Sequence, residues 1–335
     1  MLPNDFKPFE YPFPASLTAW EKDIPILREK LWSLLGDLPP DFIPAPEIVE
    51  EREEQGYLVR KITFDNGIGY GVYGYLVIPE GRTEPGPAIL YHHYHGGAYN
   101  NGKEEIFKAW ITDTSPAHAL AKEGYVVLAI DVYGFAERKN QSPAKDHRSG
   151  RKNEEALFKL FLWQGRTLWG MIVRDDRLAL NYLLSLPEVD PERVGATGMS
   201  MGSTRTWWLA ALDDRIKAAS CAGCLTRYQN LIQHGQLNQH SIYYYVPGIL
   251  KEGIDMEAVV SLIAPRPLLT LTGDIDEGSP VDGVQYINNY VQKVYELYGA
   301  GERFDGKIYK NLGHTYTPEM WEETLKWFEK HLKMI

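Results

Sequence analysis

The pattern of apolar and polar residues along the chain predicts buried strands that alternate with helices. Residues 125–131 begin with a continuous apolar run, which is typical of a strand covered on both faces. Residues 17–35 carry apolar side chains at three- and four-residue spacing, the period of an amphipathic helix. Ser16 is the candidate N-cap of that helix, and Pro25 within it suggests a break or a later start. The two patterns together indicate an α/β protein.

The order of the predicted elements favours a mostly parallel central sheet. Two alternating segments, 57–64 and 70–78, flank the turn residues 65–67 and predict an antiparallel hairpin. Strands and helices alternate after the hairpin, so we expect a mostly parallel sheet with helices on both faces. The further expected strands are 88–93, 125–131, 193–197, 216–221, 267–272 and 306–309, and the further expected helices are 115–123, 168–186, 204–212, 284–298 and 318–332.

Two long stretches interrupt this alternation. Residues 134–165 are polar and basic, and residues 225–262 are rich in Gln, His and Tyr. Both follow predicted strands, and the carboxyl ends of strands form the ligand sites of open α/β sheets. We therefore expect an N-terminal arm and helix (1–56) packed on a catalytic domain (57–335), with 225–262 as a cap-like insertion over the site.

Composition narrows the classes of partner. The 335 residues carry a formal net charge of −10, which argues against nucleic acid and anionic membranes as partners. The first residues resemble no signal peptide, and no stretch approaches the ~20 apolar residues of a membrane span. We expect a cytoplasmic protein that acts on a small molecule and possesses no metal or other cofactor, with a homo-oligomer left open. We interpret Cys221 and Cys224 as two buried thiols rather than a redox or zinc pair.

One short segment carries the strongest chemical signal. The predicted strand 193–197 leads into Gly198-x-Ser200-x-Gly202, the pattern of a nucleophile elbow. Glycines on either side of the serine remove Cβ atoms that would collide where the following helix packs back on the strand. The N–H groups of that helix point toward the serine, where a developing oxyanion could be held. Ser200 is therefore the candidate nucleophile.

A serine nucleophile needs a base and a carboxylate that orients the base. In this order of elements, the acid and then the histidine follow the serine. His314 lies after the last predicted strand and is the candidate base. The strand ending at Gly273 is followed by several candidate acids. We prefer Asp276 over Asp274 because Asp276 lies farther into the turn, and Glu277 and Asp282 are weaker candidates.

The remaining site candidates stabilise charge or line the pocket. The backbone N–H of Met201, directly after the nucleophile, is one expected oxyanion donor. The second is expected from the loop after strand 88–93, with the N–H of Gly97 preferred over the hydroxyl of Tyr99. As candidate pocket residues we take Tyr99, His95, His234, His240 and Tyr244.

Several segments of the chain resemble the α/β-hydrolase superfamily. The resemblance is strongest to its dienelactone-hydrolase and acetyl-xylan-esterase-like branch, and it covers roughly residues 57 to 333. It implies an α/β-hydrolase fold. The matching segments are His95-Gly96-Gly97, residues 124–138, Asp190-Pro191-Glu192-Arg193-Val194-Gly195, the elbow at Ser200, Ala264-Pro265-Arg266-Pro267-Leu268-Leu269, and Gly313-His314.

The resemblance also implies an activity. It implies a serine hydrolase that cleaves carboxylic esters through an acyl-enzyme, with an acetyl-esterase-like preference for short acyl groups. Ser200 would attack the carbonyl, His314 would take its proton, and Asp276 would orient His314. Dienelactone hydrolases proper use a cysteine nucleophile, whereas this elbow holds serine. Ser203 stands where many relatives have a further glycine.

Two alternative functions remain open at this point. His92, His93 and His95 form a cluster, and the latter two would face the same side of a strand and could share a metal ion in a metal-dependent hydrolase. The chain could also be a catalytically idle binding module on a hydrolase scaffold, because fold does not fix function. No member of the candidate triad is missing, which argues against the idle module.

Overall fold

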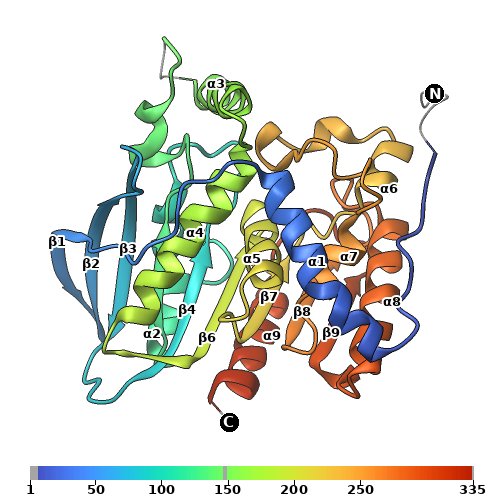
Figure 1. The fold of residues 1–335 in the computed structure, drawn as a ribbon. Coiled ribbons are helices and arrows are strands. Elements are labelled where there is room, and N and C mark those ends of the chain that lie inside the picture. Colours follow the sequence, from blue (N-terminus) through green and yellow to red (C-terminus); the bar gives the residue numbers. More distant parts are fainter. Residues whose placement is uncertain (1–6, 146–148, 334–335) are drawn as a thin grey trace.

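A computed structural model describes residues 7–145 and 149–333 of the chain. Its centre is a nine-stranded sheet with the order β1-β2-β3-β5-β4-β6-β7-β8-β9 (Figure 1). The strands are β1 (Glu47–Glu54), β2 (Tyr57–Asp65), β3 (Gly71–Pro79), β4 (Gly86–His92), β5 (Val126–Ile130), β6 (Val189–Met199), β7 (Ala218–Ala222), β8 (Leu268–Gly273) and β9 (Phe304–Tyr309).

The type of strand pairing changes once across the sheet, from antiparallel to parallel at β5. The pairings are antiparallel between β1 and β2, between β2 and β3, and between β3 and β5. β2 and β3 form the predicted hairpin. From β5 to β9 every pairing is parallel. The carboxyl ends of β4, β6, β7, β8 and β9 therefore meet at one edge of the sheet. The mostly parallel sheet confirms the predicted architecture.

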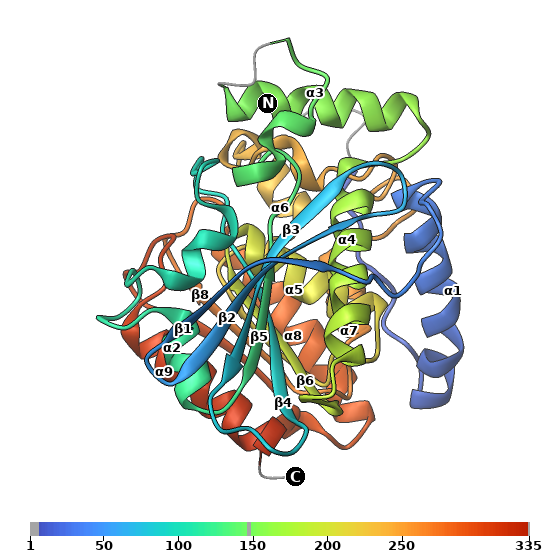
Figure 2. The ribbon, with the colours of Figure 1, turned by 90° about the vertical axis from the view of Figure 1, so that its left-hand side faces the viewer.

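Helices cover both faces of the sheet, as the view along the sheet in Figure 2 shows. Side chains of alternate strand positions, such as Leu128 and Val127, belong to two separate apolar cores, one on each face. No helix in the described part of the chain is long and apolar enough to cross a bilayer. The helices are α1 (Leu17–Leu35), α2 (Pro116–Lys122), α3 (Gly150–Trp163), α4 (Leu168–Ser185), α5 (Met201–Leu212), α6 (Tyr228–Gln233), α7 (Met256–Ser261), α8 (Val281–Leu297) and α9 (Pro318–Phe328).

The N-terminal region departs from its prediction in two ways. α1 runs unbroken through Pro25, so the expected break or later start was wrong. Pro25 is exposed, and the carbonyl that loses its helical partner there can bond to water instead. The second departure is β1, a sheet strand that the sequence did not indicate. Residues 7–15 form no helix or strand, and residues 1–6 of the expected arm lie outside the described residues.

Both long connections contain helical segments. Residues 134–165 contain a 3-10 helix, Ala136–Gln141, and the fourteen-residue α3, which crosses above the carboxyl ends of the strands in Figure 2. Residues 225–262 contain α6, α7 and a short 3-10 turn, Ile242–Tyr244. α3 contacts this turn, so the two insertions meet over the same edge of the sheet.

Candidate active site

Ser200 lies at the sharp turn between β6 and α5. Its backbone angles are φ 58° and ψ −119°, a conformation that L-residues rarely adopt. A Cβ atom added at Gly198 or Gly202 would lie 2.3 or 2.0 Å from the carbonyl oxygen of His92. Glycine is therefore required on both sides of Ser200, chiefly because the end of β4 passes so close.

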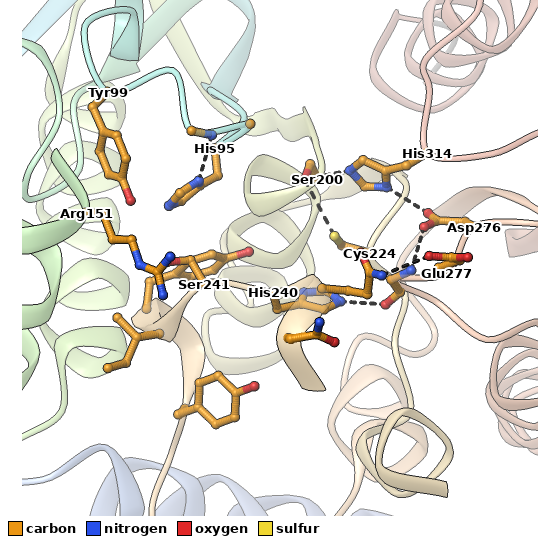
Figure 3. Close-up of a pocket in the computed structure, with 18 of the residues that line it drawn as sticks. His95, Tyr99, Arg151, Ser200, Cys224, His240, Ser241, Asp276, Glu277 and His314 are labelled. Atoms are coloured by element: carbon orange, nitrogen blue, oxygen red, sulfur yellow. Dashed lines mark hydrogen bonds and ion pairs between the residues drawn. The ribbon is translucent and has the colours of Figure 1, made fainter. Parts of the chain in front are cut away.

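The structure joins Ser200, His314 and Asp276 in one hydrogen-bonded chain (Figure 3). His314 Nδ1 lies 2.7 Å from Asp276 Oδ2, and His314 Nε2 lies 2.8 Å from Ser200 Oγ. A carboxylate can only accept, so Nδ1 carries the proton and Nε2 is free to accept from the Ser200 hydroxyl. Asp276 is buried. Asp274 takes no part in this row of hydrogen bonds. The backbone N–H of Asp274 instead bonds to the carbonyl of Tyr309.

The turn that carries Asp276 is held from both sides. The N–H of Gly278 donates to Asp276 Oδ1 at 2.9 Å. The carbonyl of Gly278 accepts from His240 Nε2 at 2.5 Å and from the hydroxyl of Thr226 at 2.8 Å. Burial lowers the pKa of His240, which favours the neutral ring. Two residues of the insertion 225–262 thus hold the turn that carries Asp276.

The loop after β4 lies on the other side of Ser200. Gly96 and Gly97 have φ values of +48° and +68°, which glycine adopts without strain. The N–H of Gly97 donates to Nδ1 of His95 at 3.1 Å, so this expected oxyanion donor already has an acceptor in the free protein. Met201 is the first residue of α5, and the first N–H groups of a helix lack helical partners.

A cavity of about 790 Å³ opens above the hydrogen-bonded chain. Three of the five expected pocket residues, His95, Tyr99 and His240, line it. The connection 134–165 contributes Arg151 and Glu155 to its walls, and the insertion 225–262 contributes polar and aromatic side chains. Glu277, a weaker candidate acid, also lines it. The lining residues that the sequence did not single out include Arg151, Glu155, Asn238, Gln239, Ser241, Tyr243, Tyr245 and Ile275.

Two of the expected pocket residues do not line this cavity. His234 is exposed, and its Nε2 lies 3.0 Å from a carboxylate oxygen of Asp282. Tyr244 is buried behind the wall, stacked on Tyr245 with ring centroids 4.9 Å apart. The 3-10 turn at 242–244 directs Tyr243 rather than Tyr244 toward the cavity. A run of three tyrosines does not reveal which ring faces inward.

Cys224 is a further neighbour of Ser200. Its Sγ lies 3.6 Å from Ser200 Oγ. Burial raises the pKa of the Cys224 thiol to about 12, so the thiol stays protonated at neutral pH. Cys221 is buried as well, and both cysteines are free. The two residues are therefore the buried thiols that the sequence indicated.

The histidine cluster does not form a shared ligand set. His92 Nδ1 bonds to the hydroxyl of Thr206 at 2.9 Å. His93 Nε2 accepts from the N–H of Val132 at 3.2 Å. His95 directs Nε2 toward α3 and Nδ1 toward its own loop. Within residues 7–145 and 149–333, no group of three His, Cys, Asp or Glu side chains is arranged to hold a metal ion.

Comparison with known proteins places the chain in a family. The model of the dienelactone hydrolase family matches residues 72–247. "Putative hydrolase YtaP" of Bacillus subtilis is 36% identical over 310 residues, which cover 91% of this chain and 98% of the relative.

Solved structures show the same α/β-hydrolase fold. A "putative acetyl xylan esterase" from Bacteroides fragilis is 20% identical with a TM-score of 0.70, over 89% of this chain and 78% of that one. A glucuronoyl esterase from Solibacter usitatus is 17% identical with a TM-score of 0.70, over 97% and 99% of the two chains. From the family match and the similarity to the Bacillus relative, the chain belongs to the dienelactone hydrolase family.

Proposed function

We propose that this hydrolase is a serine esterase that cleaves carboxylic esters through an acyl-enzyme. The observation that carries the proposal is the hydrogen-bonded chain from Ser200 Oγ through His314 to the buried Asp276. A serine hydroxyl is a weak nucleophile by itself and becomes reactive when an oriented imidazole takes its proton. The open cavity above Ser200 gives an ester access to that hydroxyl.

The residues divide the reaction between them. Ser200 Oγ attacks the ester carbonyl while its proton passes to His314 Nε2. The N–H of Met201 donates to the oxyanion that forms, and the N–H of Gly97 turns from His95 to become the second donor. His314 then gives its proton to the leaving alcohol, and a water molecule resolves the acyl-enzyme by the same route. Asp276 holds the proton on Nδ1 and stabilises the charged imidazolium.

The acyl group is proposed to be short, as in an acetyl esterase. Support comes from the acetyl xylan esterase among the structures with this fold. The walls of the cavity offer amides, hydroxyls and tyrosine rings, which suit a polar alcohol portion better than a long acyl chain.

Hydrolysis of p-nitrophenyl esters tests the proposal. We expect the wild type to cleave the acetate faster than the butyrate and octanoate, and Ser200→Ala to lose this turnover while unfolding at the wild-type temperature. Turnover that persists in Ser200→Ala would remove the serine from the mechanism. A wild type that prefers octanoate would overturn the short-acyl assignment and leave the nucleophile intact.

A further inference from the structure

Glu154 of α3 is a buried carboxylate that binds three residues from two separate segments of the pocket wall. Only 2% of the residue is exposed. Its oxygens accept from His95 Nε2 at 3.1 Å, from the Tyr99 hydroxyl at 3.1 Å, and from the hydroxyl of Ser241. His95 and Tyr99 belong to the loop after β4, and Ser241 belongs to the insertion 225–262. Burying a carboxylate is costly unless donors compensate it, and these three donors do so.

From this arrangement we propose that Glu154 is a positioning residue for oxyanion stabilisation, acting through His95 on Gly97. The inference rests on the proposed esterase function. Glu154 can only accept, so it holds the His95 proton on Nε2. Nδ1 of His95 then keeps a free lone pair, which accepts the N–H of Gly97. The carboxylate therefore sets the tautomer that holds the Gly97 peptide in place.

Packing independently ties α3 to the same loop. A Cβ atom at Gly150, the first residue of α3, would lie 2.0 Å from the ring of Tyr99. The ring of His95 stacks on Tyr243, with centroids 5.3 Å apart and an angle of 22° between the planes. Figure 3 shows His95 and Tyr99 on the side of the cavity opposite His314 and Asp276. His95 is thus held by a hydrogen bond and by stacking, and it has little freedom to turn.

This arrangement gives Glu154 a role in the transition state rather than in substrate binding. Before reaction, the N–H of Gly97 donates to Nδ1 of His95, so this N–H is not left without an acceptor. When the oxyanion forms, it replaces Nδ1 as the stronger, charged acceptor. Because His95 stays fixed on Glu154, the loop returns to the same position after each turnover. A loop displaced by as little as 1 Å would misdirect the donor, and displacements of that size cost about 10²-fold in rate.

The variant Glu154→Gln tests the role directly. The side-chain amide keeps the size of the carboxylate but fixes the His95 tautomer less firmly. Its neutral carbonyl is a weaker acceptor than a carboxylate, and its NH₂ group can donate to His95 Nε2, which moves the ring proton to Nδ1. The Nδ1–H then faces the N–H of Gly97, donor against donor. We expect kcat on p-nitrophenyl acetate to fall about 10- to 100-fold with KM nearly unchanged, less than the roughly 10²–10³-fold cost of losing an oxyanion donor outright. Lys159→Gln, an exposed change on the same helix, serves as the matched control.

A second variant separates loop positioning from general loosening of the wall. Ser241→Ala removes one donor to Glu154 and leaves the bond to His95. We expect its loss of kcat to be much smaller than that of Glu154→Gln. If Ser241→Ala matches Glu154→Gln, the effect comes from the contact between insertions, and the positioning role is overturned.

The tautomer of His95 can be read in the wild type without any activity. Long-range ¹H–¹⁵N spectra of histidine-labelled protein, with the His95 signal identified by its loss in His95→Gln, should show the proton on Nε2. A proton on Nδ1 would overturn the inference even if Glu154→Gln fails to fold. An inactive wild type with the expected tautomer would count against the esterase proposal and leave the positioning of Gly97 standing. If the wild type is active and depends on Ser200 but Glu154→Gln has an unchanged kcat, the positioning role is overturned and the esterase proposal stands.

Discussion

A Cβ atom added at Gly202 would lie only 2.0 Å from the carbonyl oxygen of His92. A Gly-to-Ala change inside a helix normally stabilises by about 1 kcal/mol. Here we expect Gly202→Ala to destabilise the protein by about 1–3 kcal/mol, because the added methyl group pushes β4 away from α5. Urea unfolding measures the change, and esterase assays should show reduced kcat from a displaced Ser200. An unchanged or higher unfolding midpoint would mean that this contact relaxes easily.

The assignment of the acid rests on the bond between Asp276 and His314. In Ser-His-Asp enzymes, Asn in place of the acid lowers kcat by about 10⁴ because it favours the wrong imidazole tautomer. We expect Asp276→Asn to cause a loss of this order and Asp274→Asn to leave kcat near the wild-type value. Both variants keep the side-chain shape and differ from each other only in position. The opposite ranking in parallel kcat measurements would reassign the acid to Asp274.

The sheet and the three residues of the hydrogen-bonded chain were predictable for local reasons. Buried strands are apolar throughout, and Ser200, His314 and Asp276 each follow the end of a strand within a glycine-containing turn. β1 was not predictable, because it is a highly charged edge strand whose residues are nearly all exposed. It joins the sheet through backbone bonds to β2, which leave no apolar pattern in the sequence.

The pocket wall was less predictable, because it depends on how the insertions dock. Glu154 lies 59 residues from His95 and 87 from Ser241, and no short motif links them. One signal was present: Glu154 shares the buried face of α3 with Leu157 and Phe161, three and seven residues later. A carboxylate on the apolar face of a helix indicates a partnered charge. It does not reveal which segments supply the partners.

Cys224 lies beside Ser200, the proposed nucleophile, but should not react in its place. Burial raises its pKa to about 12, and a protonated thiol alkylates slowly. We expect iodoacetamide at pH 8 to leave esterase activity intact, and a fluorophosphonate to abolish it with a single adduct on Ser200 by mass spectrometry. Rapid inactivation by iodoacetamide that disappears in Cys224→Ala would show a reactive thiolate at the site.

Activity should not depend on a metal ion at the histidine cluster. The pKa values of His92 and His93 are lowered chiefly by burial, and each ring already bonds to a protein group. We expect dialysis against EDTA to leave kcat unchanged. A large loss that zinc restores would contradict this expectation and favour a metal-dependent hydrolase.

Glu105 should make stability depend on pH in an unusual direction. Burial raises its pKa from 4.5 to about 8, although the Tyr91 hydroxyl and the Tyr94 N–H both donate to it at 2.7 Å. Its folded pKa exceeds the unfolded value, so the folded state binds more protons between these two pH values. The free energy of unfolding therefore falls as the pH rises from about 4.5 toward 8.

Glu105→Gln isolates this contribution because glutamine cannot ionise. The buried Asp131, whose pKa is raised by burial to about 7, contributes with the same sign but is present in both proteins. We expect the free energy of unfolding of the wild type, minus that of Glu105→Gln, to decrease steadily from pH 5 to pH 8 in urea titrations. A difference that stays constant over this range would mean that Glu105 has the same pKa in the folded and unfolded states.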